Sequence, residues 1–301
     1  MSTEDRFVRV TEVGPRDGLQ NEASIVSLED KIRFVDALSA AGYPEIETSS
    51  FVSPKWVPQL ADASEVFSGI RRRPGTVYSA LVPNERGQER SLSCGVDKIA
   101  VFTAASESFC ERNLNTTIAG SIERFTPVLE EARARSQPVR GYVSCVVRCP
   151  YEGDVESTRV AETVRLLVDA ADGEIEIALG ETLGVAAPDD IERILAAVGE
   201  VVPLEEIDLH LHDTNGLAVE CASRALDLGV RRFDASCAGL GGCPYAPGAS
   251  GNLATGDLLQ MLDRQGWVTG IDIARVRDAA MIAREITGRS TGGARASRRA
   301  D

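Results

Sequence analysis

The 301-residue sequence lacks several features that would fix its class at once. It has no run of about 18 apolar residues, which a membrane-spanning helix needs. The N-terminal segment MSTEDRFVRV carries neither an apolar signal core nor an arginine-rich presequence. The seven cysteines are scattered without metal-finger spacing, as is typical of reduced thiols in a cytoplasm. These absences predict a cytoplasmic protein without a membrane partner.

Positive charge is also scarce. A net charge of −14 argues against nucleic acid or an anionic membrane as partner. An anionic substrate would therefore need a local positive site, either a metal ion or a dedicated arginine. No linker or short repeat divides the chain, and its 43% apolar residues are ample for a large core. We expect a single domain over residues 1–288 and a disordered, solvated basic tail over 289–301.

A recurring pattern of short apolar strand, loop and amphipathic helix runs through the chain. Alternation of this kind indicates right-handed βαβ units and a parallel sheet. Eight units in a chain of this length favour an α/β fold closed into a (β/α)8 TIM barrel over an open sheet. The predicted strands are Arg9–Val13, Glu45–Thr48, Val77–Leu81, Lys98–Phe102, Arg140–Ser144, Ile175–Leu179, Ile207–Leu211 and Arg232–Ser236.

Several helix boundaries are marked by local signals. Ser27 and Asp30 resemble a capping box, and Gly42 is placed to end the same helix. Its predicted buried stripe consists of Leu28, Ile32, Val35 and Leu38. Further helices are predicted over Pro188–Val198 and Leu217–Leu228, with two extra C-terminal helices over about Leu253–Gln265 and Ile271–Thr287.

The only two histidines, His210 and His212, lie two residues apart at the end of a predicted strand. Side chains repeat every two residues along a strand, so both imidazoles should point the same way. Two neutral imidazoles that converge on one point suit a divalent cation. A pair of satisfied core histidines is the alternative interpretation.

Other polar residues follow strands at the same end of the predicted barrel, where barrel enzymes carry their chemistry. Arg16 and Asp17 follow the first strand, Glu47 ends the second and Glu181 ends the sixth. We expect Asp17 to be a metal ligand and Arg16 to stabilise an anion on a substrate oxygen. Glu47 would orient Arg16 or support the metal. A polar turn and an exposed loop glutamate are the alternatives.

The run AGLGGCPYAPGASGNLAT follows the eighth strand. It lacks the order G-x-G-x-x-G of dinucleotide sites and is typical of a mobile active-site loop. It carries Cys243, whose thiol could be reactive there, and ends near Asn252, which offers an amide oxygen. Together Asp17, His210, His212 and Asn252 favour Mg²⁺ or Mn²⁺, with Zn²⁺, Co²⁺ and Fe²⁺ as alternatives.

The same residues carry a resemblance that extends from about Val10 to Leu262. The runs VGPRDGLQNE, IETSSFVSPKWVPQLAD, VRGYVSC, CPYEG, HLHD and AGLGGCPYAPGASGNLATGDL resemble those of the 3-hydroxy-3-methylglutaryl-CoA lyases. The resemblance implies a metal-dependent retro-Claisen cleavage of this acyl-CoA to acetyl-CoA and acetoacetate, a role in leucine catabolism and a homodimer.

The resemblance also assigns roles to individual residues. The proton acceptor for the substrate hydroxyl stays open between His210, Glu181 and a metal-bound water, and Cys243 would protonate the enolate carbon. By the family's pattern, Asp17, His210, His212 and Asn252 match metal ligands, Arg16 the catalytic arginine, Glu47 an active-site carboxylate and Cys243 the loop cysteine, while Arg16 and Gln20 are expected to bind substrate.

Four residues depart from the family's pattern. Ala178, Glu181, Arg148 and Asn215 stand where these lyases have serine, aspartate, glycine and tyrosine. The departures leave open a related 3-hydroxy-3-substituted acyl-CoA as substrate. A related synthase or aldolase acting on 2-oxo acids, and a non-catalytic barrel, are the remaining alternatives.

Overall fold

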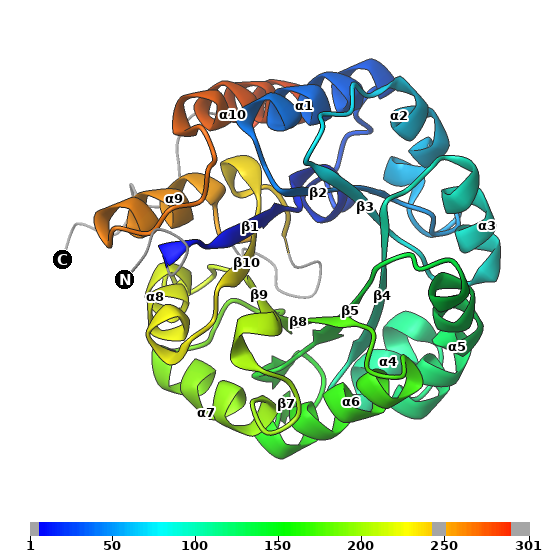
Figure 1. Cartoon of the computed structure of the whole chain (residues 1–301), viewed down its shortest axis with the longest axis vertical. Coiled ribbons are helices and arrows are strands. Elements are labelled where there is room, and N and C mark those ends of the chain that lie inside the picture. Colours follow the sequence, from blue (N-terminus) through cyan, green and yellow to red (C-terminus); the bar gives the residue numbers. More distant parts are fainter. Residues whose placement is uncertain (1–5, 243–250, 290–301) are drawn as a thin grey trace.

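The computed structural model describes residues 6–242 and 251–289 and shows a closed barrel of parallel strands (Figure 1). Around the barrel the order is β1-β2-β3-β4-β5-β8-β9-β10. The predicted eight-stranded barrel is confirmed, and each strand lies within two residues of its predicted bounds. The strands are β1 (Arg9–Glu12), β2 (Glu45–Ser50), β3 (Val77–Leu81), β4 (Lys98–Ala104), β5 (Val139–Ser144), β8 (Glu176–Glu181), β9 (Ile207–Leu211) and β10 (Arg232–Ala235).

Helices surround the strands in a ring (Figure 1). The predicted C-terminal helices are confirmed as the last two of the ring, of which α10 packs against α1. Among the described residues, no helix combines the length and apolar character needed to cross a bilayer. The helices are α1 (Leu28–Ala41), α2 (Ala63–Gly69), α3 (Glu85–Ser93), α4 (Glu107–Leu114), α5 (Ile118–Ala134), α6 (Ser157–Ala170), α7 (Pro188–Val198), α8 (Ala218–Leu228), α9 (Thr255–Arg264) and α10 (Ile273–Thr287).

Helix α1 has the predicted caps but not all of the predicted buried stripe. The Ser27 hydroxyl accepts the Asp30 N–H, and Gly42 ends the helix with a left-handed φ of 89°. Leu28 was predicted to be buried and is exposed. One turn further on, Lys31 is buried instead, because its ammonium group forms an ion pair with Asp62 at 2.7 Å. The buried face therefore begins with the alkyl chain of a lysine.

Charged side chains fill the barrel interior near the amino ends of the strands. The buried guanidinium of Arg140 donates to Asp234 at 2.8 Å, to Asp208 at 3.0 Å and to the Thr11 hydroxyl at 3.1 Å. Beside it, an ammonium group and further arginines pair with the remaining carboxylates. We call this layer the barrel floor; it consists of Glu45, Glu176, Asp208 and Asp234 with Arg9, Lys98, Arg140 and Arg232.

Two features outside the barrel differ from the sequence-based expectations. The loop after β5 contains a short antiparallel hairpin of β6 (Arg148–Cys149) and β7 (Gly153–Asp154), which was not predicted because its strands are too short to show a period. Arg289 was expected in a solvated tail. Instead it pairs with Glu22 at 2.6 Å and donates to backbone carbonyls of the loop after β10. The six cysteines within the described ranges form no disulfide.

Candidate active site

A tight turn after β1 places Arg16 and Asp17 at the carboxyl end of the barrel. Residues 14–18, GPRDG, form a single wide helical turn in which three successive N–H groups donate to the Val13 carbonyl. A Cβ atom on Gly18 would lie 2.8 Å from the Cβ of Leu240. Only glycine therefore allows this close approach between the loops after β1 and β10.

Arg16 is buried and held by two carboxylates. Its Nε and Nη2 donate to Oε2 of Glu47 at 2.8 and 2.7 Å, and its Nη1 donates to Oδ1 of Asp17 at 2.6 Å. Burial opposes the charge of Arg16, but Glu47 and Asp17 outweigh burial and raise its pKa. For Glu47, burial prevails over Arg16 and raises the pKa of the carboxyl group. Glu47 therefore makes the contact with Arg16 that one of its two predicted roles requires, and that role stays a prediction.

The two histidines of the β9 segment converge on Asp17. The Nε2 atoms of His210 and His212 lie 3.4 Å apart, and Oδ2 of Asp17 lies 3.8 Å from Nε2 of His210. One potential ligand atom from each of the three residues lies within 4.8 Å of the others. The common direction predicted for the two imidazoles is therefore observed.

Asn252 joins this group from the segment that follows β10. It forms an antiparallel bridge with His212, and its Nδ2 donates to Oδ2 of Asp17 at 2.8 Å and to the Leu240 carbonyl at 3.0 Å. Its Oδ1 is buried without a hydrogen-bond partner among the described residues. We call Asp17, His210, His212 and Asn252 the ligand cluster. Two imidazoles, a carboxylate and an unpaired amide oxygen fit a divalent cation.

Titration of the cluster follows from burial and neighbouring charge. Burial opposes ionisation of Asp17, but Arg16 and both histidines outweigh it and lower its pKa. Burial, with help from His210, lowers the pKa of His212 to about 4. Burial disfavours a proton on His210 as well, yet the hydrogen bond to Asp234 and the charge of Asp17 raise the pKa of that imidazole. Near neutral pH the cluster therefore offers a carboxylate and the neutral imidazole of His212.

Behind the cluster lie groups that the sequence analysis missed. Nδ1 of His210 lies 3.1 Å from Oδ2 of Asp234, a residue of the barrel floor. The Tyr142 hydroxyl lies 3.2 Å from the same oxygen and 3.3 Å from Oε2 of Glu47. Tyr142 therefore connects the carboxylate behind His210 with the carboxylate behind Arg16. The available signal was a charged residue inside an apolar strand, Asp234 in the run RFDAS.

Among the described residues, Glu181 and Gln20 are predicted site residues that lie outside the ligand cluster. On β8, Glu176 and Ala178 face the barrel interior. Glu181 lies an odd number of residues from both, so side-chain alternation turns it to the outer face of β8. Burial raises its pKa to about 7, and its charge contributes to the raised pKa of Cys221 on α8. Gln20 is half-buried after the Arg16 turn, with a buried Oε1 that lacks a partner in the described part of the chain. Cys243 lies outside the described residues.

The other departures from the family's pattern lie in different surroundings. Ala178 is buried in the barrel interior, where it packs in one cluster with Tyr142. Arg148 is exposed in the β6–β7 hairpin and pairs with Asp154 at 3.4 Å. Asn215 is exposed after β9 and donates to the Val185 carbonyl at 3.4 Å. Among the departures, Ala178 alone therefore touches a residue that contacts the site.

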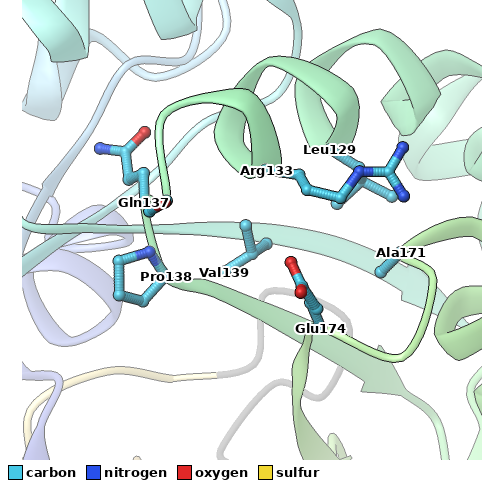
Figure 2. A pocket seen from close by; sticks show the side chains of 8 residues that line it. Leu129, Arg133, Gln137, Pro138, Val139, Ala171 and Glu174 are labelled. Carbon is cyan, nitrogen blue, oxygen red and sulfur yellow. The ribbon is translucent and has the colours of Figure 1, made fainter.

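Figure 2 shows a surface pocket that is unrelated to the cluster. It is lined by Val139, the first residue of β5, and by Glu174, which precedes β8. It therefore lies at the amino ends of the strands, opposite the end that carries chemistry in barrel enzymes. Its one arginine, Arg133, already forms an ion pair with Asp172 at 2.7 Å.

Comparison with family models and with curated proteins points to the same family. Residues 7–282 match the family described as HMGL-like. A Pseudomonas aeruginosa protein named 3-hydroxy-3-isohexenylglutaryl-CoA/hydroxy-methylglutaryl-CoA lyase is 50% identical over 285 residues, which is 95% of this chain and 94% of that protein.

Solved structures agree with the sequence comparison. The crystal structure of hydroxymethylglutaryl-CoA lyase from Pseudomonas aeruginosa superposes with a TM-score of 0.93 at 50% identity, covering 96% of each chain. An HMG-CoA lyase from Acinetobacter baumannii, titled as a complex with coenzyme A and 3-methylmalate, superposes with a TM-score of 0.92 at 36% identity. That match covers 100% of this chain and 98% of the other.

Proposed function

The chain belongs to the HMGL-like family, and on that premise we propose that it is a carbon–carbon lyase that cleaves 3-hydroxy-3-methylglutaryl-CoA to acetyl-CoA and acetoacetate. Relatives that share 49–50% sequence identity with nearly the whole chain are named as lyases of this thioester. The observation that carries the proposal is the convergence of Asp17, His210 and His212 beside a buried arginine. An oxygen-binding centre and a fixed positive charge are what the cleavage needs.

We propose that the ligand cluster holds Mg²⁺ or Mn²⁺. Three donor atoms already lie within 4.8 Å of one another, and the buried Oδ1 of Asn252 lacks any other partner among the described residues. A bound divalent cation would make the tertiary hydroxyl of the substrate more acidic. The mixed nitrogen and oxygen donors, with no cysteine among the described ligands, support a cation of this kind over structural zinc.

Arg16 is placed to stabilise the enolate that forms when the carbon–carbon bond breaks. A guanidinium has five N–H groups, of which three are used by Glu47 and Asp17. Two therefore remain for a substrate oxygen, and the two carboxylates prevent the side chain from turning away. A fixed donor of this type typically contributes about 3–4 kcal/mol to lowering the barrier.

The cleavage needs a base for the substrate hydroxyl and a proton donor for the enolate carbon, and the resemblance predicts candidates for both. Of the two side chains predicted as base, His210 lies in the ligand cluster, and alternation with Ile177 and Leu179 places Glu181 on the outer face of β8. We propose the ligand role for His210, because its Nδ1 already faces Asp234 and Nε2 cannot hold a cation and a proton together. Cys243 as donor to the enolate carbon, and Gln20 as a substrate contact, stay predictions.

A second candidate function is cleavage of a thioester with a longer side chain at the tertiary carbon. The Pseudomonas aeruginosa relative is named for an isohexenyl substrate as well as for the methyl one. Ala178 supports this candidate, because it removes the hydroxyl group that the family's serine would place next to Tyr142. The cytoplasmic location, the homodimer and the place in leucine catabolism stay predictions.

The test measures acetyl-CoA release from 3-hydroxy-3-methylglutaryl-CoA and from 3-hydroxy-3-isohexenylglutaryl-CoA. Each thioester is assayed with Mn²⁺ and again after the metal is removed by chelation. We expect metal-dependent release, a loss of at least about 100-fold in Asp17→Asn, and no change in Asp263→Asn, an exposed aspartate of α9. The ratio of the two rates identifies the preferred acyl group. Release that survives both chelation and D17N would contradict the metal site. A chain that binds Mn²⁺ but cleaves neither thioester would contradict the lyase assignment.

A further inference from the structure

The two histidines of the ligand cluster differ in what lies behind their rings. Nδ1 of His210 lies 3.1 Å from Oδ2 of Asp234. Nδ1 of His212 is buried and has no hydrogen-bond partner among the described residues. The Nε2 atoms of both rings face each other at 3.4 Å. Within the described residues, one histidine therefore has a hydrogen-bond partner that can set its orientation and tautomer, and the other has none.

A neutral imidazole carries a single N–H, and the hydrogen bond of one nitrogen decides which nitrogen keeps the proton. A carboxylate can only accept, so Asp234 holds the proton of His210 on Nδ1. The lone pair of His210 then lies on Nε2, the atom that faces His212 and Asp17. This is the nitrogen that the ligand role requires.

Asp234 is itself fixed from below. Its Oδ1 accepts from Nη1 of Arg140 at 2.8 Å, and its Oδ2 also lies 3.2 Å from the Tyr142 hydroxyl. All three side chains are buried. Because a guanidinium is always a donor, Oδ1 is committed to Arg140 and Oδ2 is the oxygen left for His210.

We propose that Asp234 is a positioning residue for the metal site: held by Arg140, it fixes the Nδ1–H tautomer of His210 and aims Nε2 at the cation. The proposal rests on the proposed function in one respect, since the cation is the one assigned to the ligand cluster. Carboxylates behind metal-bound histidines typically change metal affinity about 10- to 100-fold.

The variant Asp234→Asn tests the proposal directly, because it should reverse the hydrogen bond to Nδ1 of His210. Arg140 donates to the atom that replaces Oδ1, so the amide oxygen must occupy that place and the NH₂ group must face His210. The imidazole then has to accept at Nδ1, and its proton moves to Nε2. Asp208→Asn is the matched control, because Asp208 is equally buried and accepts from the same Arg140 at 3.0 Å. Within the described part of the chain, Asp208 forms no hydrogen bond or ion pair with either histidine.

The first measurement is Mn²⁺ binding by calorimetry to the wild type, D234N and D208N. We expect the Kd of D234N to rise about 10- to 100-fold and that of D208N to stay within about threefold, at similar melting temperatures. Equal effects of the two substitutions would overturn the proposal, because the loss would then follow from disturbing Arg140 and the barrel floor.

The second measurement reads the tautomer without metal. The chain has only two histidines, so ¹⁵N-histidine labelling gives two imidazoles, observed at about pH 9, where imidazoles are neutral. We expect the Nδ1–H form for His210 in the wild type, the Nε2–H form in D234N, and an unchanged spectrum for His212. A wild-type His210 with its proton on Nε2 overturns the proposal, whether or not D234N folds.

The two measurements separate this proposal from the proposed function. If the wild type binds no Mn²⁺ while His210 shows the Nδ1–H form only when Asp234 is present, the metal assignment fails and the positioning role is supported. If Mn²⁺ binds tightly and D234N leaves both the tautomer and the Kd unchanged, the metal site is supported and the positioning role is overturned.

Discussion

The barrel interior contains two charged regions that differ in how their charges are balanced. In the barrel floor four carboxylates face four cations. At the carboxyl end of the barrel, which we call the mouth, Asp17 and Glu47 face Arg16 as their one guanidinium or ammonium partner among the described residues, beside two imidazoles. The floor therefore balances its formal charges within itself, whereas the described residues of the mouth carry a surplus of negative charge. The difference separates a region that stabilises the barrel from the proposed metal site.

The pKa values of two floor carboxyl groups show how burial and ion pairing compete in this layer. Burial opposes ionisation of Glu45, but Arg140 and Lys98 prevail and lower its pKa to about 2. For Asp208 burial prevails over Arg140 and raises the pKa of the carboxyl group. Burial and ion pairing therefore compete within the floor, and the outcome differs between two carboxyl groups that both face Arg140.

The strongest test of the floor is Arg140→Met. It leaves Asp208 and Asp234 buried without their main cation, so we expect the free energy of unfolding to fall by about 3–5 kcal/mol. Urea denaturation of the metal-free protein measures this loss. Arg133→Met is the control, because its pair with Asp172 is exposed and should contribute less than about 1 kcal/mol. Equal losses in the two variants would contradict a structural role for the floor.

The corresponding test of the mouth is Arg16→Gln. We expect kcat to fall about 10²- to 10³-fold, because a fixed donor to the enolate oxygen is lost. Mn²⁺ affinity should change by less than about tenfold, since the ligand cluster is retained. Steady-state kinetics and calorimetry measure the two quantities. Arg193→Gln, an exposed arginine of α7, should leave both unchanged, and a similar fall in its kcat would contradict the assignment.

Glu181 provides a third case: its buried carboxyl group lies outside the ligand cluster and has no ion-pair partner among the residues that the structure describes. Its pKa is about 7 in the folded state, against an ordinary value of 4.5. Between these values the folded chain binds more protons than the unfolded chain, so stability falls as pH rises from about 4.5 to 7. Glu181→Gln removes this loss.

The matching measurement compares the two proteins across pH. We expect the stability of E181Q relative to wild type to grow from pH 5 to pH 8 by up to about 3 kcal/mol. Melting temperatures measured at each pH give the difference, and parallel curves for the two proteins would show that Glu181 is ionised throughout. Acetyl-CoA release should not change, because the side chain lies on the outer face of β8.

The smallest expected effect comes from the hydroxyl that links the two regions. Tyr142→Phe removes the contacts to Asp234 and Glu47 and keeps the ring that packs against His210. We expect kcat to fall about three- to tenfold, which corresponds to roughly 1 kcal/mol for a lost hydrogen bond. Thermal melting should shift by only a few degrees. A loss as large as that of R16Q would mean that the hydroxyl touches the substrate.

The fold and much of the site could be predicted because their signals are local. Strand and helix periods, the Ser27 cap and Gly42 gave the element order, and the two-residue spacing of His210 and His212 gave their common direction. Tyr142 and Asp234 could not be predicted in this way. Their contact spans 92 residues of sequence, and a side-chain pair across a barrel depends on strand register that no single segment contains.

Two failures have simpler physical causes. Glu181 was expected at the mouth because it ends a strand, but strand alternation sends every second side chain outward, and Ile177 and Leu179 share its face. Leu28 fits the helical period of α1, yet a period does not tell where the core begins along a helix. Where a residue lies along a strand or helix and which way its side chain points are separate properties, and each needs its own signal.

The barrel floor draws residues from β1, β2, β4, β5, β8, β9 and β10. It ties these strands together across the barrel axis with no group taken from the loops at the mouth. Loop sequences can therefore change over evolutionary time, or be exchanged by grafting, while the strand register beneath them is kept. The same independence makes this barrel a natural starting scaffold for lyases with other acyl preferences.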